Sequence, residues 1–127
     1  MAILFKPVER GEPGVAGGGK RKYYASPVMN GVITLEDFTK SIEKRSTVNG
    51  ADIRAVLYAM VDVAIEHLAD GALVRLGDLG SIRINLRTTG KDTPEAVDAS
   101  SINKAVLTYT PGRRLKEMLS NVKYKKK

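Results

Sequence analysis

The stretch VRLGDLGSIRINL, Val74 to Leu86, decides the fold of this chain. It alternates apolar and polar residues, is interrupted at Gly77-Asp78-Leu79-Gly80, and then alternates again. Alternation of period two is typical of a strand with one buried face, and the glycines indicate a tight turn. The stretch therefore predicts a hairpin with Arg83 and Arg87 on one face and an apolar face that enters the core. That apolar face consists of Ile82, Ile84 and Leu86.

Two helices are predicted before this hairpin. Thr34 with Asp37 forms a variant of the capping box, and apolar residues follow at helical spacing to about residue 45. Asn49, with Asp52 three residues later, caps a longer helix that ends at Gly71. Its apolar positions recur at steps of three and four and are Ile53, Val56, Leu57, Met60, Val61, Ala64, Ile65 and Leu68. The short first helix cannot cover this face, so we expect a second copy of the chain to complete the core.

The flanking segments supply further elements. Residues 2–10 predict a strand, and a flexible Gly-rich loop separates it from a second short strand that ends near Pro27. After the hairpin we expect a helical turn or loop over residues 94–101, then a strand over residues 105–109. Thr110-Pro111 is expected to cap a last helix that carries Leu115, Met118, Leu119 and Val122, and the final KYKKK is expected to fray. The predicted class is α+β.

Composition limits the possible functions. The chain has 127 residues, which suggests one domain with an appendage, and its 43% hydrophobic content permits only a small core. There is no cysteine, which excludes disulfides and zinc–thiolate sites and fits a reducing cytosol. No apolar run approaches the roughly 20 residues of a membrane span. The first residues, MAILFKPVER, do not have the pattern of a signal peptide.

Positive charge is in excess and unevenly placed. The net charge is +7, and residues 113–127 contain seven Lys or Arg and one Glu. Polyanions are the natural partners of such a surface, nucleic acid first and an anionic membrane second. A basic tail that only increases solubility is the alternative.

Catalytic chemistry finds no support in the residues. His67 is the only histidine, and no second histidine or cysteine exists to build a metal site or activate a nucleophile. Gly17-Gly18-Gly19-Lys20 does not have the spacing of a phosphate-binding loop. We therefore expect neither enzyme activity nor a cofactor, a metal or a small-molecule substrate.

The ordered pattern resembles the HU/IHF family of small basic bacterial DNA-binding proteins. The resemblance covers Thr34 to about Val122 and rests on the helix pair, on VRLGDLGSIRI and on YTPGRRLKEML. It implies an intertwined homodimer with a helical base, a saddle of strands and a β-ribbon arm that reaches into the minor groove. The resemblance divides the chain into an N-terminal extension (1–33) like that of a longer HU-related subgroup, an HU-like domain (34–122) and a basic tail (123–127).

The arm region departs from the family pattern. The family's arm tip is rich in arginine and carries a proline that wedges between base pairs, whereas this chain has TTGKDTPEAVDASSINK, residues 88–104. Its charge is 2 − 3 = −1. Carboxylates in the minor groove would repel phosphates, so we do not expect Pro94 to intercalate.

The residues expected to contact DNA fall on the hairpin, the arm, the last helix and the tail. They are Arg75, Arg83, Arg87, Lys91, Lys104, Arg113, Arg114, Lys116 and Lys123. The strand arginines share a face, and the first turn of a helix suits a phosphate. The alternatives are a solvated strand face, ordinary helix-surface charge and a solubilising tail.

The function expected from these features is largely sequence-neutral binding of double-stranded DNA by a nucleoid-associated homodimer in the cytoplasm. A heterodimer with a related chain is also possible. A second hypothesis is a dimeric protein-interaction scaffold that kept the fold and lost DNA binding. A third is binding of RNA or a membrane surface through the basic tails alone.

Overall fold

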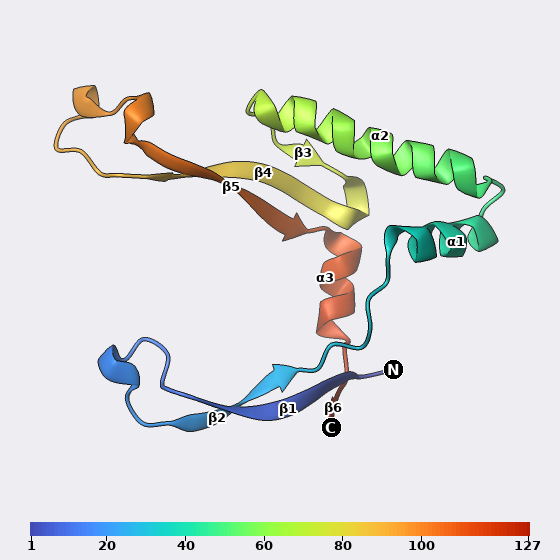
Figure 1. The fold of residues 1–127 in the computed structure, drawn as a ribbon, viewed down its shortest axis with the longest axis horizontal. Coiled ribbons are helices and arrows are strands. Elements are labelled where there is room, and N and C mark those ends of the chain that lie inside the picture. Colours follow the sequence, from blue (N-terminus) through green and yellow to red (C-terminus); the bar gives the residue numbers. More distant parts are fainter.

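The chain folds into two three-stranded sheets and three α-helices (Figure 1). The computed structural model describes residues 1–127. The strands are β1 (Ile3–Arg10), β2 (Lys22–Pro27), β3 (Val74–Arg75), β4 (Gly80–Thr88), β5 (Ile102–Pro111) and β6 (Tyr124–Lys126). The α-helices are α1 (Leu35–Arg45), α2 (Gly50–Ala69) and α3 (Arg113–Ser120). Short 3-10 turns are η1 (Ala16–Gly18), η2 (Gly77–Leu79), η3 (Pro94–Ala96) and η4 (Ala99–Ser101). The predicted α+β class is confirmed.

The first sheet joins the two ends of the chain. Its strand order is β2-β1-β6, with β1 antiparallel to β2 and parallel to β6. Hydrogen bonds continue beyond β6 at both ends, from the Ile3 N–H to the Lys123 carbonyl (2.8 Å) and from the Lys127 N–H to the Phe5 carbonyl (2.9 Å). The prediction that the final KYKKK frays is therefore wrong, because β1 offers these residues an unpaired strand edge.

Both predicted helix caps are present. Thr34 and Asp37 form a reciprocal capping box at α1, in which the Asp37 N–H donates to Thr34 Oγ1 (3.2 Å) and the Thr34 N–H donates to Asp37 Oδ2 (3.1 Å). At α2, the Asp52 N–H donates to Asn49 Oδ1 (3.0 Å). Gly71, with φ of +86°, lies just past the end of α2. The local signals in the sequence thus placed both helices correctly.

The second sheet contains the predicted hairpin and has the strand order β3-β4-β5. The turn η2 links β3 to β4 and packs against the start of α3. Gly112 lies so close to the Asp78 carbonyl that a side chain there would collide with it, and Gly80 approaches the Thr110 carbonyl in the same way with φ of +126°. These glycines allow the turn, the end of β5 and the start of α3 to meet.

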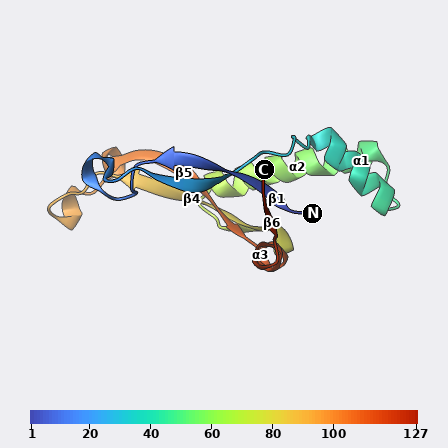
Figure 2. The same cartoon turned by 90° about the horizontal axis from the view of Figure 1, so that it is seen from below.

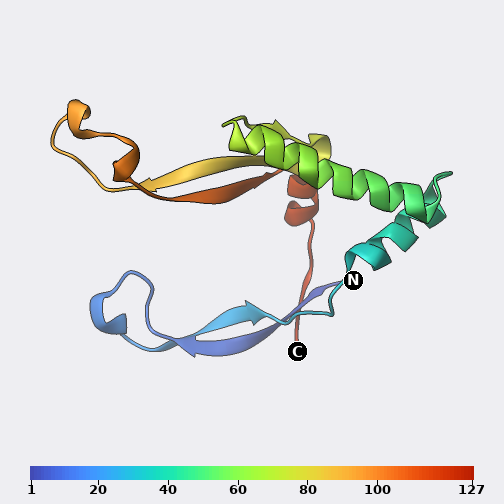
Figure 3. The ribbon, with the colours of Figure 1, turned by 45° about the horizontal axis from the view of Figure 1, so that its top comes forward.

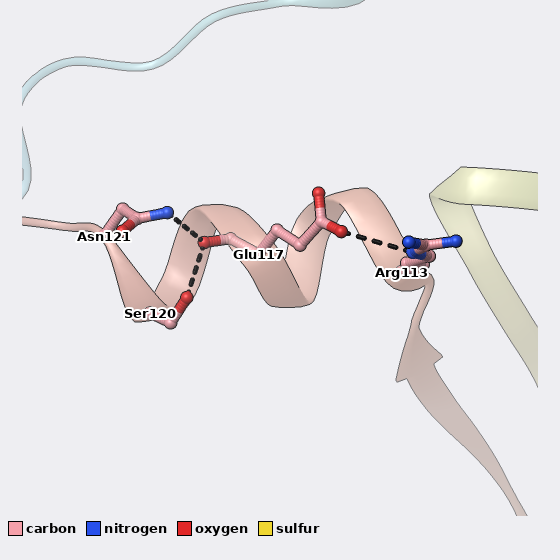
Figure 4. Close-up of polar contacts among 4 residues, drawn as sticks. All are labelled: Arg113, Glu117, Ser120 and Asn121. Carbon is pink, nitrogen blue, oxygen red and sulfur yellow. Dashed lines mark hydrogen bonds and ion pairs between the residues drawn. The ribbon is translucent and has the colours of Figure 1, made fainter.

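The last helix has different limits from those predicted. Thr110 and Pro111 belong to β5, and Gly112 is the N-cap of α3. The helix ends at Ser120, so Val122 lies beyond it. Ser120 Oγ (2.8 Å) and Asn121 Nδ2 (3.0 Å) both donate to the Glu117 carbonyl (Figure 4). These side chains satisfy a carbonyl of the last turn, which ends the helix before Val122.

Two hairpins project from the molecule in the same direction. Figures 1 and 3 show the β1–β2 hairpin and the β4–β5 hairpin extending side by side, with α3 joining the two sheets at their other ends. Seen from below in Figure 2, the two hairpins overlap, so both views place them alongside each other. The β4–β5 hairpin ends in η3 and η4, which confirms the helical turns predicted over residues 94–101.

One chain alone forms almost no core. Ile53 and Leu68 are its only buried large apolar side chains. The apolar face of the second sheet is uncovered, with Ile84 38%, Leu86 54% and Leu107 66% exposed. The prediction that Ile84 and Leu86 enter the core is therefore wrong for the single chain, because α2 packs on this sheet mainly along the two-residue strand β3.

Candidate nucleic-acid interface

The register of the second sheet places four of the predicted cations on one face. Arg83 and Arg87 share a face because they are four residues apart on β4. Lys104 of β5 lies directly opposite Arg87, and Arg75 of β3 lies directly opposite Ser81. Since opposed residues in antiparallel strands point to the same side, all four cations lie together. We call Arg75, Arg83, Arg87 and Lys104 the second-sheet basic face.

A polar pair lies between these cations. Asn85, midway between Arg83 and Arg87, donates from Nδ2 to Thr108 Oγ1 across the β4–β5 ladder. Thr108 lies opposite Arg83 in the register, and both members of the pair are half-buried. This hydrogen bond links the two strands beneath the exposed basic groups. The sequence analysis did not select Asn85 or Thr108, although the period-two pattern of β4 could have identified Asn85 as a member of the polar face.

The start of α3 lies beside the turn that links β3 to β4. Tyr109 of β5 donates its hydroxyl to the Leu79 carbonyl (2.6 Å), which holds the turn against the end of β5. Gly112 makes no side-chain cap, so the first N–H groups of α3 have no side-chain acceptor there. Arg113, Arg114 and Lys116 are exposed around this end of the helix. The packing thus brings the α3 cations to the end of the sheet from which Arg75 leads into the turn.

One of the candidate cations is already paired. Arg113 Nε donates to Glu117 Oε1 at 3.2 Å along α3 (Figure 4). Both side chains are largely exposed, and such pairs contribute little to stability. The other two ion pairs of the structure join Arg21 to Glu9 and Lys22 to Glu12. The second-sheet basic face therefore carries four unpaired positive charges.

The remaining candidates lie apart from this face. Lys91 is exposed in the tip of the β4–β5 hairpin, and Lys123 immediately precedes β6 in the first sheet. The tip also carries Asp98, whose pKa is lowered because the Ser100 hydroxyl and N–H groups donate to its carboxylate. Asp98 is thus ionised at neutral pH, and the negative character predicted for the arm tip is confirmed for this residue.

Other kinds of site find no geometry in this structure. No group of three or more His, Asp or Glu side chains is placed to hold a metal ion. None of the helices combines the length and apolar character needed to cross a membrane. The largest concave region is an open groove of about 810 Å³ between the base of the first sheet and the end of α3. Its lining is mostly apolar and includes Leu4, Val28, Met118 and Val122.

Comparison with known proteins places the chain. No curated protein matches it. A crystal structure from Bacteroides vulgatus, described as a "putative bacterial DNA binding protein", superimposes with a TM-score of 0.71 at 17% identity, which shows a shared fold. The match covers 98% of this chain and 48% of that one, so this chain spans about half of its structural relative. The family model HU-HIG, described as an HU domain fused to a winged helix-turn-helix, Ig or glycine-rich motif, matches residues 1–126, and the chain therefore belongs to this HU-related family.

Proposed function

We propose that this protein binds double-stranded DNA with little sequence preference, as a nucleoid-associated homodimer. The observation that carries the proposal is the second-sheet basic face, where four unpaired cations and the Asn85–Thr108 pair lie together on one side of a sheet. Lys and Arg side chains that meet phosphates supply affinity without reading the bases. No part of this role requires catalysis, a metal or a cofactor.

The dimer is proposed from the apolar surface that one chain leaves exposed. On α2, Tyr58, Val61 and Ile65 follow one another at helical spacing and are 59%, 54% and 58% exposed. A second row, Val56, Met60 and Val63, is also exposed. A helix that is apolar on several sides is normally buried, and an uncovered surface of this extent marks an interface. A second copy of the same chain offers matching apolar surface and is the occupant we propose.

The arm is proposed to touch DNA without wedging into it. Pro94 begins the turn η3 and is followed by Glu95, so its ring belongs to a short helical turn that carries a carboxylate. Lys91 is the only basic residue between Thr88 and Asn103, whereas Asp92, Glu95 and Asp98 are acidic. Like charges repel phosphates, so we propose that affinity comes from the sheet and α3 and that sharp kinking is absent.

The proposal is tested by fluorescence anisotropy with two labelled 30-base-pair duplexes of unrelated random sequence. At low salt we expect both duplexes to bind with the same affinity within a factor of about three, and the affinity to fall steeply as salt rises. Absence of binding to both duplexes at low salt would contradict the proposal. A large preference for one duplex would contradict its sequence-neutral part.

A second candidate function is a protein-interaction scaffold of the same fold. The acidic arm tip favours it, because Asp98 is held ionised at the far end of an exposed hairpin. This candidate predicts that the dimer forms normally and that random duplexes fail to bind. The same anisotropy experiment, combined with sedimentation of the free protein, therefore separates the two functions.

A further inference from the structure

The first sheet gathers basic residues from both ends of the chain. We infer that one face of this sheet is a second phosphate-contacting surface for duplex DNA, separate from the second-sheet basic face. The inference rests on the proposed function and extends it to the N-terminal hairpin and the C-terminal strand. Its cations are Lys6, Arg10, Lys22 and Lys125, which we call the first-sheet basic face.

The register brings these four residues to one side. Lys6 and Arg10 are four apart on β1, and Lys22 lies opposite Arg10 on β2. Lys125 lies beside Leu4 on β6. Leu4 is two residues from Lys6, and residues paired across a sheet point to the same face. All four cations are exposed. Residues more than 100 positions apart in the sequence therefore form one basic surface.

No carboxylate of the strands lies on this face. Glu9, the only acidic residue in the three strands, is paired with Tyr23 in the register and points to the opposite side. It is also held by Arg21 at 3.1 Å. Glu12 in the loop pairs with Lys22 at 3.0 Å, but Lys6, Arg10 and Lys125 form no ion pair. Three positive charges on this face are thus available to an external anion.

The dimensions suit a duplex backbone. A strand rises about 3.3 Å per residue, so the row from the level of Leu4 to Arg10 is about 20 Å long. Phosphates on one DNA strand recur about every 3.4 Å along the helix axis, so this row extends over about six base pairs. The β1–β2 hairpin also projects alongside the β4–β5 hairpin (Figures 1 and 3), so both basic surfaces belong to projections of the same orientation.

The distribution of apolar residues favours DNA over an anionic membrane. The opposite face of the first sheet holds an apolar groove lined by Ile3, Phe5, Ala25, Pro27 and Tyr124. A membrane-surface element inserts apolar side chains while its basic groups remain at the headgroups on the same side. Here the apolar groove and the cations lie on opposite faces of one sheet, so a flat membrane cannot engage both.

Adjacent lysines on β6 provide a matched test. Lys125 lies on the basic face, whereas Lys126 pairs with Phe5 and lies on the opposite face. We compare the double variant Lys6→Gln, Lys125→Gln with the double variant Arg21→Gln, Lys126→Gln, which removes the same charge from the other side. Both are checked for unchanged circular dichroism and oligomeric state, and the salt dependence of duplex binding is measured for each.

We expect the basic-face variant to lower the slope of log affinity against log salt by about 1.8, or 0.9 for each lost phosphate contact, and the opposite-face variant to leave it unchanged. Equal reductions in both variants would show an unspecific basic tail and overturn the inference. An unchanged slope in the basic-face variant, with normal binding by the unaltered protein, would overturn this inference alone. Failure of the unaltered protein to bind would overturn the proposed function as well. Loss of binding to vesicles of phosphatidylserine and phosphatidylcholine, with duplex binding retained, would also overturn it.

Discussion

Arg87 of β4 lies directly opposite Lys104 of β5, so two like charges face each other on the exposed side of the second sheet. Like charges in directly opposed positions destabilise a sheet. The pair therefore imposes a local cost on the folded protein, and no carboxylate of the chain forms an ion pair with either residue to relieve it. A bound phosphate would relieve the repulsion, which links this local feature to DNA binding.

The first prediction concerns this pair. Lys104→Glu replaces a repulsive cross-strand pair by an attractive one and should raise the free energy of unfolding by about 0.2–1 kcal/mol. The same substitution should weaken binding to random duplex DNA and reduce its salt dependence. Thermal melts and anisotropy measure the two effects. Lys91→Glu, in the arm tip, is the control that reverses a charge without a cross-strand partner, and equal stabilisation by both variants would refute the explanation.

A second prediction addresses the dimer. Ile65→Glu places a charge in the exposed apolar row of α2 and should convert the dimer to a poorly folded monomer, since burying an unpaired charge is costly. Sedimentation equilibrium measures the mass, and the melting temperature of the unaltered protein should rise with its concentration. Glu66→Gln alters the neighbouring exposed residue and should remain dimeric. A well-folded monomer of the unaltered protein would contradict the proposed assembly.

The third prediction concerns the ion pair on α3. Glu117→Gln removes the partner of Arg113 and should strengthen duplex binding at low salt, because the freed guanidinium can contact a phosphate. The slope of affinity against salt should increase by up to about 0.9. Glu36→Gln on α1 removes the same charge elsewhere and serves as the control. If both substitutions strengthen binding equally, net charge rather than Arg113 is responsible.

Acid should weaken the α1 cap. The N–H and hydroxyl groups of Thr34 donate to Asp37 and lower the pKa of its carboxyl in the folded state. A lowered folded-state pKa stabilises the protein above the unfolded pKa of about 4, and this contribution is lost as the pH falls through the folded value. Circular dichroism melts between pH 6 and pH 2 should show a loss in the unaltered protein that Asp37→Asn lacks. An identical pH dependence in the two proteins would disprove this role of Asp37.

Local patterns in the sequence predicted most of the elements. The caps at Thr34 and Asn49 and the turn at Gly77 depend on neighbouring residues, so their signals lie within a few positions. The pairing of β6 with β1 gives no such signal. It joins residues at opposite ends of the chain through a strand that contains two lysines, a residue type that strands disfavour.

The candidate interface was predictable only in part. The period of β4 placed Arg83 and Arg87 on one face, because that relation depends on spacing alone. The positions of Lys104 and Arg75 depend on the register between strands, and the loop of the arm hides it. The sequence also could not show that the basic residues at the two ends of the chain form one sheet, so Lys6, Arg10 and Lys125 were missed.

The salt dependence of duplex binding tests the central claim most directly. The triple variant Arg83→Gln, Arg87→Gln, Lys104→Gln is compared with the control Lys40→Gln, Lys44→Gln, Arg45→Gln, which removes three exposed charges from α1. If the second-sheet basic face holds DNA, the first variant lowers the slope of log affinity against log salt by about 2.7 and the control leaves it unchanged. An unchanged slope in the first variant, or equal reductions in both, would contradict the claim.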